Sequence, residues 1–214
     1  MKLGITNVMT LTGKAKELMD FMEKENIELM ERKRKEENEW HAGQEAKNGV
    51  GIIVKPNLEE YVEAVEYTSD KVMRIQLRTR NVVKDFIQVY AQQTGNKEEN
   101  IEDFLEVLES INTDVEAIVM SDLYAHVGIE SLGKEEIIGP YGYGRKNEEG
   151  EKLFDFCERN RMFLGNTWFC RKNSQKITRY GWDDRRTKTV IDYFLVEMKN
   201  RRLLMEVTEL AGEV

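Results

Sequence analysis

Four polar residues in this chain follow or interrupt apolar runs of the kind that form buried strands. They are Asn7 in "GITNV", Tyr90 in "IQVYAQQTG", Asp122 in "IVMSDLYAH" and Asp192 in "VIDYFLV". Oxygen-bearing side chains that converge at strand ends suit a divalent cation. The first three also have an ordinary structural interpretation, with Asn7 capping a turn, Tyr90 packing in the core and Asp122 forming a turn.

Asp192 is harder to explain as a structural residue. It lies among Val190, Ile191 and Phe194 on a predicted central strand. A carboxylate in such a place costs several kcal/mol unless it is hydrogen-bonded or paired. We therefore interpret Asp192 as a residue with a specific role.

The elements that must position these side chains are three amphipathic helices and a set of short strands. In the helical segments the apolar residues share one face: Leu18, Phe21 and Met22; Ile101, Leu105 and Leu108; Leu153, Phe154 and Cys157. The strand-like runs are "KLGITNV", "GVGIIV", "KVMRIQL", "FIQVYA", "EAIVM", "FLGNTWF" and "TVIDYFLV". "KVMRIQLR" alternates as a half-buried antiparallel strand does, and "EAIVM" is apolar throughout, as a central strand is. This order predicts an α/β or α+β fold with a mixed sheet covered by helices.

Length and composition favour one domain over residues 1–214, without linkers or repeats. No apolar run approaches the roughly 18–20 residues that span a bilayer, and the N-terminal segment lacks a signal-peptide core. The protein is expected inside the cell, in the nucleus or the cytoplasm, as a monomer. Cys157 and Cys170 both fall in apolar patterns, so both are expected to be buried thiols.

The net charge of −8, from 32 basic and 40 acidic residues, argues against binding polyanions by bulk charge alone. A nuclease that carries metal ions is still compatible with an acidic chain, because the cation supplies local positive charge.

Several segments together resemble one family. "GITNVMTLTGK", "NGVGIIV", "VYAQQTG", "SDLYAHVG", "GYGRKNEEGEKLFDF", "NTWF" and "IDYFLV" stand in the order and spacing of the endonuclease/exonuclease/phosphatase superfamily. Within it, the chain resembles the endonuclease domain of non-LTR retrotransposons and the craniofacial development protein 2-like proteins, to about Arg202. The resemblance implies a four-layer sandwich of two mixed sheets flanked by helices, and Mg²⁺-dependent hydrolysis of a phosphodiester.

The resemblance also implies roles for individual residues. Asn7 matches the asparagine that helps to order the metal, and Tyr90 the tyrosine that contacts the scissile phosphate. Asp122 matches the aspartate that positions or activates the nucleophile. Asp192 matches the aspartate that orients the catalytic histidine.

The chain departs from the family pattern in three places. Tyr124 stands where the family has an asparagine that hydrogen-bonds the phosphate; losing such a donor typically costs roughly 10²–10³-fold in rate. The metal-binding glutamate is best matched by Glu31, with Glu28, Glu36 and Glu37 as alternatives. The segment "ERKRKEENE" also suits a solvated charged turn or a helix extension. The family's Ser-Asp-His motif is absent from the 214 residues, so the domain is expected to lack its last strands.

Without that histidine, the carboxylate of Asp192 is expected to be either solvated or partly protonated. His126 and His41 are the two histidines present, and neither is assigned as the general base. Arg145 and Asn147, in "GYGRKNEEG", are candidates for contacting a nucleic-acid backbone, and Tyr124 is a third. The structural alternative is that Asn147 caps a helix.

The sequence thus predicts a Mg²⁺-dependent phosphodiesterase or endonuclease-like domain of retrotransposon origin with impaired catalysis. The alternatives are a non-catalytic descendant that binds nucleic acid or protein, and a decayed transposon fragment. Mg²⁺ is the expected cofactor unless the degenerate site has lost it. DNA, held weakly through its phosphate backbone, is the expected partner, with a protein partner as the alternative and no membrane.

Overall fold

The computed structural model describes residues 2–7, 15–33, 50–69, 72–78, 82–90, 101–110, 115–180, 188–204 and 206–210. Within these ranges the side chains at 5–7, 15, 31–33, 50, 69, 90, 102, 103, 180, 203 and 206–210 lie outside the description.

Two mixed β-sheets form the centre of the molecule. The larger has six strands in the order β4-β5-β6-β7-β11-β8, and the smaller has four in the order β12-β1-β2-β3. In the larger sheet β6 and β7 run parallel and the other neighbours antiparallel; in the smaller, β1 runs parallel to both β12 and β2. The strands are β1 (Lys2–Asn7), β2 (Leu29–Lys33), β3 (Val50–Val54), β4 (Val62–Ser69), β5 (Val72–Arg78), β6 (Val83–Tyr90), β7 (Glu116–Asp122), β8 (Met162–Leu164), β11 (Asp192–Glu197) and β12 (Glu206–Leu210), with a small pair β9 (Arg179–Tyr180) and β10 (Lys188–Thr189).

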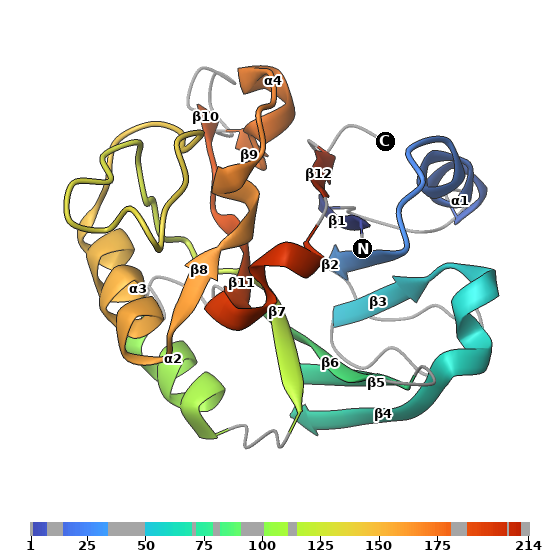
Figure 1. Ribbon diagram of the computed structural model, residues 1–214. Helices are drawn as coiled ribbons and strands as arrows, with labels where there is room; N and C mark the ends of the chain where they lie inside the picture. Colours follow the sequence, from blue (N-terminus) through green and yellow to red (C-terminus); the bar gives the residue numbers. More distant parts are fainter. Residues whose placement is uncertain are drawn as a thin grey trace.

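Helices cover the two outer faces, which gives the four layers that the resemblance implied. The helices are α1 (Ala15–Lys24), α2 (Ile101–Ser110), α3 (Glu148–Arg159) and α4 (Asn173–Lys176), with 3-10 turns η1 (Pro56–Tyr61), η2 (Gly165–Trp168) and η3 (Met198–Leu203). In Figure 1, α2 and α3 lie on one side of the molecule and α1 on the other. The apolar faces of α2 and α3 pack on the larger sheet, whereas Leu18 and Met22 of α1 pack on Met30 of the smaller one.

The two sheets meet face to face in an apolar layer that contains side chains from both. Leu3 and Leu29 of the smaller sheet pack there with Phe86, Met120 and Phe194 of the larger. Because side chains alternate along a strand, Ala117 and Val119 of β7 lie on the opposite face of the sheet, in the apolar layer under the helices. The prediction that "EAIVM" is a central strand covered on both faces is confirmed.

Several local predictions differ from the structure. The predicted strand in "FLGNTWF" ends at Leu164, because residues 165–168 turn into η2. Strands β4 and β12 were not predicted, because glutamates weaken the apolar character of both segments. Cys157 is buried, as expected, but Cys170 is exposed, so the prediction of two buried thiols is wrong for Cys170. Among the described residues, no helix is long and apolar enough to cross a membrane.

Candidate functional site

Three of the predicted site residues stand side by side at the ends of neighbouring strands. Tyr90 ends β6 and pairs with Asp122 at the end of β7, and Asp122 in turn pairs with Asp192 at the start of β11. Residues directly opposite each other in a sheet share a face. Met120 and Phe194, two residues from Asp122 and Asp192, both lie in the apolar layer between the sheets. The row Tyr90–Asp122–Asp192 therefore ends this layer, although the side chain of Tyr90 is outside the described part.

Both carboxylates of this row are buried. Asp122 is 4% exposed and Asp192 is 0% exposed. Of the two expected states of the Asp192 carboxylate, the solvated one is therefore wrong, and partial protonation stays a prediction. The strand ends beside it are covered rather than open, since Val190, Ile191 and Tyr193 next to it are buried as well.

Asn166 fixes the backbone of β11 around Asp192, and sequence reasoning missed it. Its Nδ2 donates a hydrogen bond to the carbonyl of Asp192 at 2.9 Å, and its Oδ1 accepts one from the amide of Phe194 at 3.4 Å. Asn166 lies in η2, where β8 has stopped, so its carboxamide replaces the strand pairing that β8 no longer offers. The available signal was a polar residue in the otherwise apolar "FLGNTWF".

The predicted metal residues come from the smaller sheet. Asn7 ends β1, and Glu31 lies within β2, opposite Ile5. The interpretation of "ERKRKEENE" as a charged turn is wrong for its first three residues, because β2 continues to Lys33. The side chains of Asn7 and Glu31 lie outside the described residues, so their roles remain predictions, as do the alternatives at Glu28, Glu36 and Glu37.

The stretch "SDLYAHVG" is a strand end followed by a tightly held segment, rather than an ordinary bend. Asp122 is the last residue of β7, and the amide of Leu123 donates to the carbonyl of Ile191 at 2.8 Å. Tyr124 then takes a left-handed backbone conformation, with φ of 50°. Bulky residues seldom adopt this conformation, so the surrounding contacts must hold it in place.

The N-terminus of α3 is hydrogen-bonded to this segment at His126. Asn147 caps the helix, as the structural alternative predicted: its Oδ1 accepts hydrogen bonds from the amides of Gly150 and His126, both at 2.8 Å. The amide of Asn147 also donates to the carbonyl of His126 at 3.0 Å. The carboxamide oxygen of Asn147 thus has a structural task, and its contact with a substrate stays a prediction. Arg145 is exposed in the preceding loop.

A cationic side chain that the sequence reasoning did not select lies against Tyr124. The guanidinium carbon of Arg179, the first residue of β9, lies 5.1 Å from the centre of the Tyr124 ring. The pKa of His126 is lowered from its ordinary value, first by burial and second by the positive charge of Arg179. Arg179, Tyr124 and His126 therefore share one environment next to the carboxylate row.

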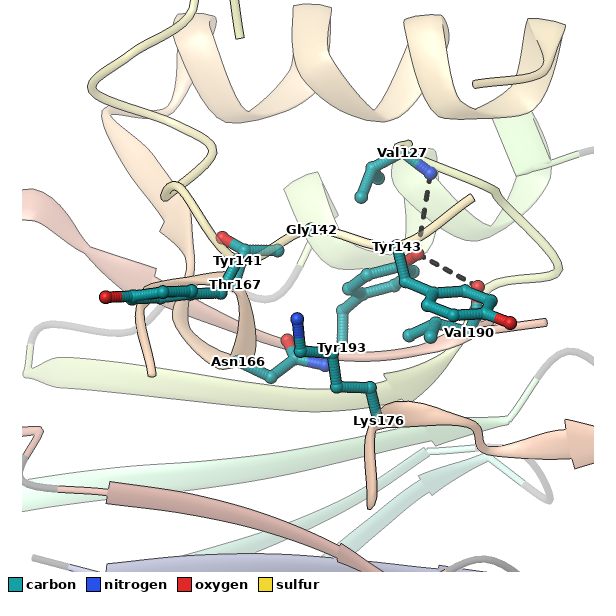
Figure 2. Close-up of a pocket in the computed structure, with 9 residues that line it drawn as sticks. All are labelled: Val127, Tyr141, Gly142, Tyr143, Asn166, Thr167, Lys176, Val190 and Tyr193. Atoms are coloured by element: carbon teal, nitrogen blue, oxygen red, sulfur yellow. Dashed lines mark hydrogen bonds between the residues drawn. The ribbon is translucent and has the colours of Figure 1, made fainter. Parts of the chain in front are cut away.

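A small pocket opens on the helix-covered side of β11 (Figure 2). Tyr141 and Tyr143 lie on opposite sides of it, and Asn166 and Lys176 contribute polar atoms. Its volume of about 10 Å³ has room for one water molecule. At its floor the hydroxyl of Tyr193 donates to the carbonyl of Val190 at 2.9 Å and accepts from the amide of Val127 at 3.4 Å. These bonds tie β11 to the segment after Tyr124.

The resemblance implies a Mg²⁺ ion at this site. Among the described residues no group of three or more histidine, cysteine, aspartate or glutamate side chains gathers at one point. The carboxylates of Asp122 and Asp192 form a pair of hard oxygen donors, which suits Mg²⁺, a cation that keeps several waters and needs few protein ligands.

Solved structures with this architecture identify the class of fold. The endonuclease domain of TRAS1, a telomere-specific non-LTR retrotransposon, matches with a TM-score of 0.58 and 12% identity over 93% of this chain and 87% of that chain. An endonuclease/exonuclease/phosphatase family protein from Leptotrichia buccalis matches with a TM-score of 0.50 and 12% identity over 96% and 90%. TDP2 from D. rerio, complexed with a single strand DNA product, matches with a TM-score of 0.52 and 10% identity over 90% and 83%. The chain has the endonuclease/exonuclease/phosphatase fold, that of deoxyribonuclease I.

In sequence, the chain is similar to craniofacial development protein 2. The proteins of that name from Tragulus javanicus and Bos taurus are each 26% identical over 168 residues, which is 76% of this chain. The chain spans less than a third of their length, 29% and 28% respectively. No protein-family model matches it. The resemblance inferred from the motifs is confirmed.

Proposed function

We propose that this chain is an endonuclease-like phosphodiesterase domain of retrotransposon origin, which binds the phosphate backbone of DNA and whose Mg²⁺-dependent hydrolysis is impaired. The observation that supports it best is the row of Tyr90, Asp122 and Asp192 at three neighbouring strand ends. The likeness to the TRAS1 endonuclease domain supports the origin.

The pairing of two buried carboxylates supports a cation at this site. Asp122 and Asp192 lie directly opposite each other, and like charges in such a pair repel. A nearby cation relieves that repulsion. We propose Asn7 and Glu31, from the facing sheet, as further residues that hold it; when bound, Mg²⁺ neutralises charge that develops on the phosphate oxygens.

We assign the activation of water and the contact with the phosphate to residues of the row. Asp122 would orient a water molecule and accept its proton as the water attacks phosphorus. The hydroxyl of Tyr90 would donate a hydrogen bond to a phosphate oxygen. Asp192 lies opposite Asp122 through the pairing of β7 with β11, and Asn166 holds the backbone of β11 on its other edge.

Tyr124 is the reason to propose impairment. A carboxamide at this position would donate to the phosphate, and without one such donor the rate falls by roughly 10²–10³-fold. The Tyr124 ring instead packs against Arg179.

The test is nicking of supercoiled DNA by the purified chain, with and without Mg²⁺. We expect slow nicking that requires Mg²⁺ and that Asp122→Asn abolishes. Asp155→Asn is the matched control, because Asp155 is an exposed aspartate on α3, away from the row. Nicking that survives Asp122→Asn would refute the assignment of this site.

A second variant tests the impairment directly. Tyr124→Asn restores the missing carboxamide, and asparagine tolerates the left-handed backbone better than tyrosine does. At saturating DNA, where weaker binding does not limit the rate, we expect Mg²⁺-dependent nicking to rise by roughly 10²-fold or more. Unchanged or slower nicking would show that Tyr124 does not limit the reaction.

Tyr124 also favours a second candidate function, a domain that binds nucleic acid or a protein without cleaving it. In that case the parent chain, Asp122→Asn and Tyr124→Asn all bind DNA, and none of them nicks it. Binding through phosphates weakens steeply with salt, whereas salt-insensitive capture indicates a protein ligand.

A further inference from the structure

Arg179 is held in place by the hydrogen bonds of its neighbours. The amide of Thr178 donates to the carbonyl of Thr189 at 3.0 Å, and the hydroxyl of Thr178 accepts from the amide of Ile191 at 3.0 Å. Arg179 itself pairs with Thr189 across β9 and β10. Its backbone is therefore attached to the segment that leads directly into Asp192.

The partner of the Arg179 side chain differs in kind from those of three other arginines. Arg74, Arg78 and Arg159 each form an ion pair with a carboxylate. The ion pairs between described residues do not include Arg179, whose described contact is the face of the Tyr124 ring. A guanidinium held on a ring keeps its N–H groups directed outward, in a planar fork that matches two oxygens of a phosphate.

Tyr124 holds its ring beneath this guanidinium by means of an uncommon backbone conformation. Its φ is 50°, and the hydrogen bonds on both sides, from Leu123 to Ile191 and from His126 to Asn147, fix the chain there. His126 follows on the same segment, and its imidazole is half-buried within the electrostatic reach of Arg179.

We propose that Arg179 is a phosphate-binding residue, that Tyr124 positions it, and that His126 lies at the edge of the same anion site. This inference rests on the proposed function, since the anion would be a phosphate of the bound DNA strand. It adds a residue outside the carboxylate row, and it gives the site a positive charge that the chain's overall acidity does not predict.

The experiment follows the imidazole of His126 by NMR while inorganic phosphate is added without Mg²⁺. The chain has two histidines, so His41→Gln identifies the signal of His126. A bound phosphate offsets the charge of Arg179, and we expect the pKa of His126 to rise as the site fills. A short DNA strand with and without a 5′ phosphate then distinguishes a terminal phosphate from a backbone phosphate as the ligand.

Variants separate a binding role from a structural one. We expect Arg179→Gln to weaken phosphate binding at least tenfold and Arg179→Lys, which keeps the charge but loses the fork, to weaken it severalfold. The matched control is Arg201→Gln, because Arg201 also stacks on an aromatic ring, 3.4 Å from the centre of Trp168, but in η3. Tyr124→Leu should also reduce phosphate binding, although this variant still contains Arg179.

The inference is overturned if Arg179→Gln and Arg179→Lys bind phosphate as the parent chain does, or if phosphate leaves the pKa of His126 unchanged. If Arg179→Gln does not fold, the Arg179→Lys comparison still decides. Failure of the proposed function looks different: nicking would be absent, or insensitive to Asp122→Asn, while phosphate binding in the absence of metal still depended on Arg179.

Discussion

Gly150 provides a test of how the segment after Asp122 is held, because the structure reverses the usual effect of its substitution. Gly150 lies in the first turn of α3, where alanine ordinarily stabilises a helix by up to about 1 kcal/mol. Here a Cβ at Gly150 would lie 2.0 Å from the carbonyl oxygen of His126 and 2.7 Å from its carbonyl carbon. Ordinary contacts begin near 3.4 Å, so the helix and the segment must separate by about 1 Å or more.

We therefore expect Gly150→Ala to destabilise the protein. The forced separation also strains the hydrogen bonds that Asn147 makes with His126 and Gly150, each at 2.8 Å. Overpacking of this kind costs about 1–3 kcal/mol, which exceeds the gain from helix propensity. The measurement is urea unfolding, with Asp155→Ala as a control at an exposed position of the same helix. A Gly150→Ala protein that is as stable as the parent, or more stable, would refute the reasoning.

Three further outcomes are expected. Asn166→Ala should lower the free energy of unfolding by about 1–3 kcal/mol, because the carbonyl of Asp192 and the amide of Phe194 lose their hydrogen bonds to the carboxamide. The control is Asn173→Ala, at an exposed position of α4. Equal effects of the two substitutions would contradict the role of Asn166 in holding β11. Cys170 should react with a thiol reagent in the native protein and Cys157 only after unfolding, since burial raises the pKa of the Cys157 thiol; Cys170→Ser should then remove all native-state labelling. The lowered pKa of His126 means that the unfolded chain binds more protons below about pH 6.5, so stability should fall as pH drops through that region, and His126→Gln should flatten this slope.

The sequence predicts which segments form strands better than it predicts which strands pair with each other. Alternation in "KVMRIQLR" and continuous apolarity in "EAIVM" report which faces are buried, and these predictions are confirmed. The row of Tyr90, Asp122 and Asp192 depends on the register between β6, β7 and β11, which no single segment encodes. Family resemblance, rather than periodicity, suggested that these residues belong together.

Arg179 and Asn166 were missed for a related physical reason. Each acts through a contact with a residue far away in sequence: Arg179 with the ring of Tyr124, and Asn166 with the backbone of β11. The exposure of Cys170 was also missed, because the strand expected in "FLGNTWF" turns away at Gly165 into a 3-10 helix. Local apolar patterns do not report where a strand loses its partner.

The described contacts divide the site into two halves that are held together differently. Hydrogen bonds link the row at Asp122 and Asp192 to the segment that carries Tyr124 and to Asn166, so this half behaves as one piece of the larger sheet. Asn7 and Glu31 belong to the smaller sheet, which packs on the larger one through apolar side chains such as Leu3 and Phe86. Apolar packing is less directional than hydrogen bonding, so the distance between the carboxylate row and the proposed metal residues depends on how well this layer is filled. Substitutions in the layer should therefore affect Mg²⁺-dependent nicking before they affect binding of phosphate at Arg179.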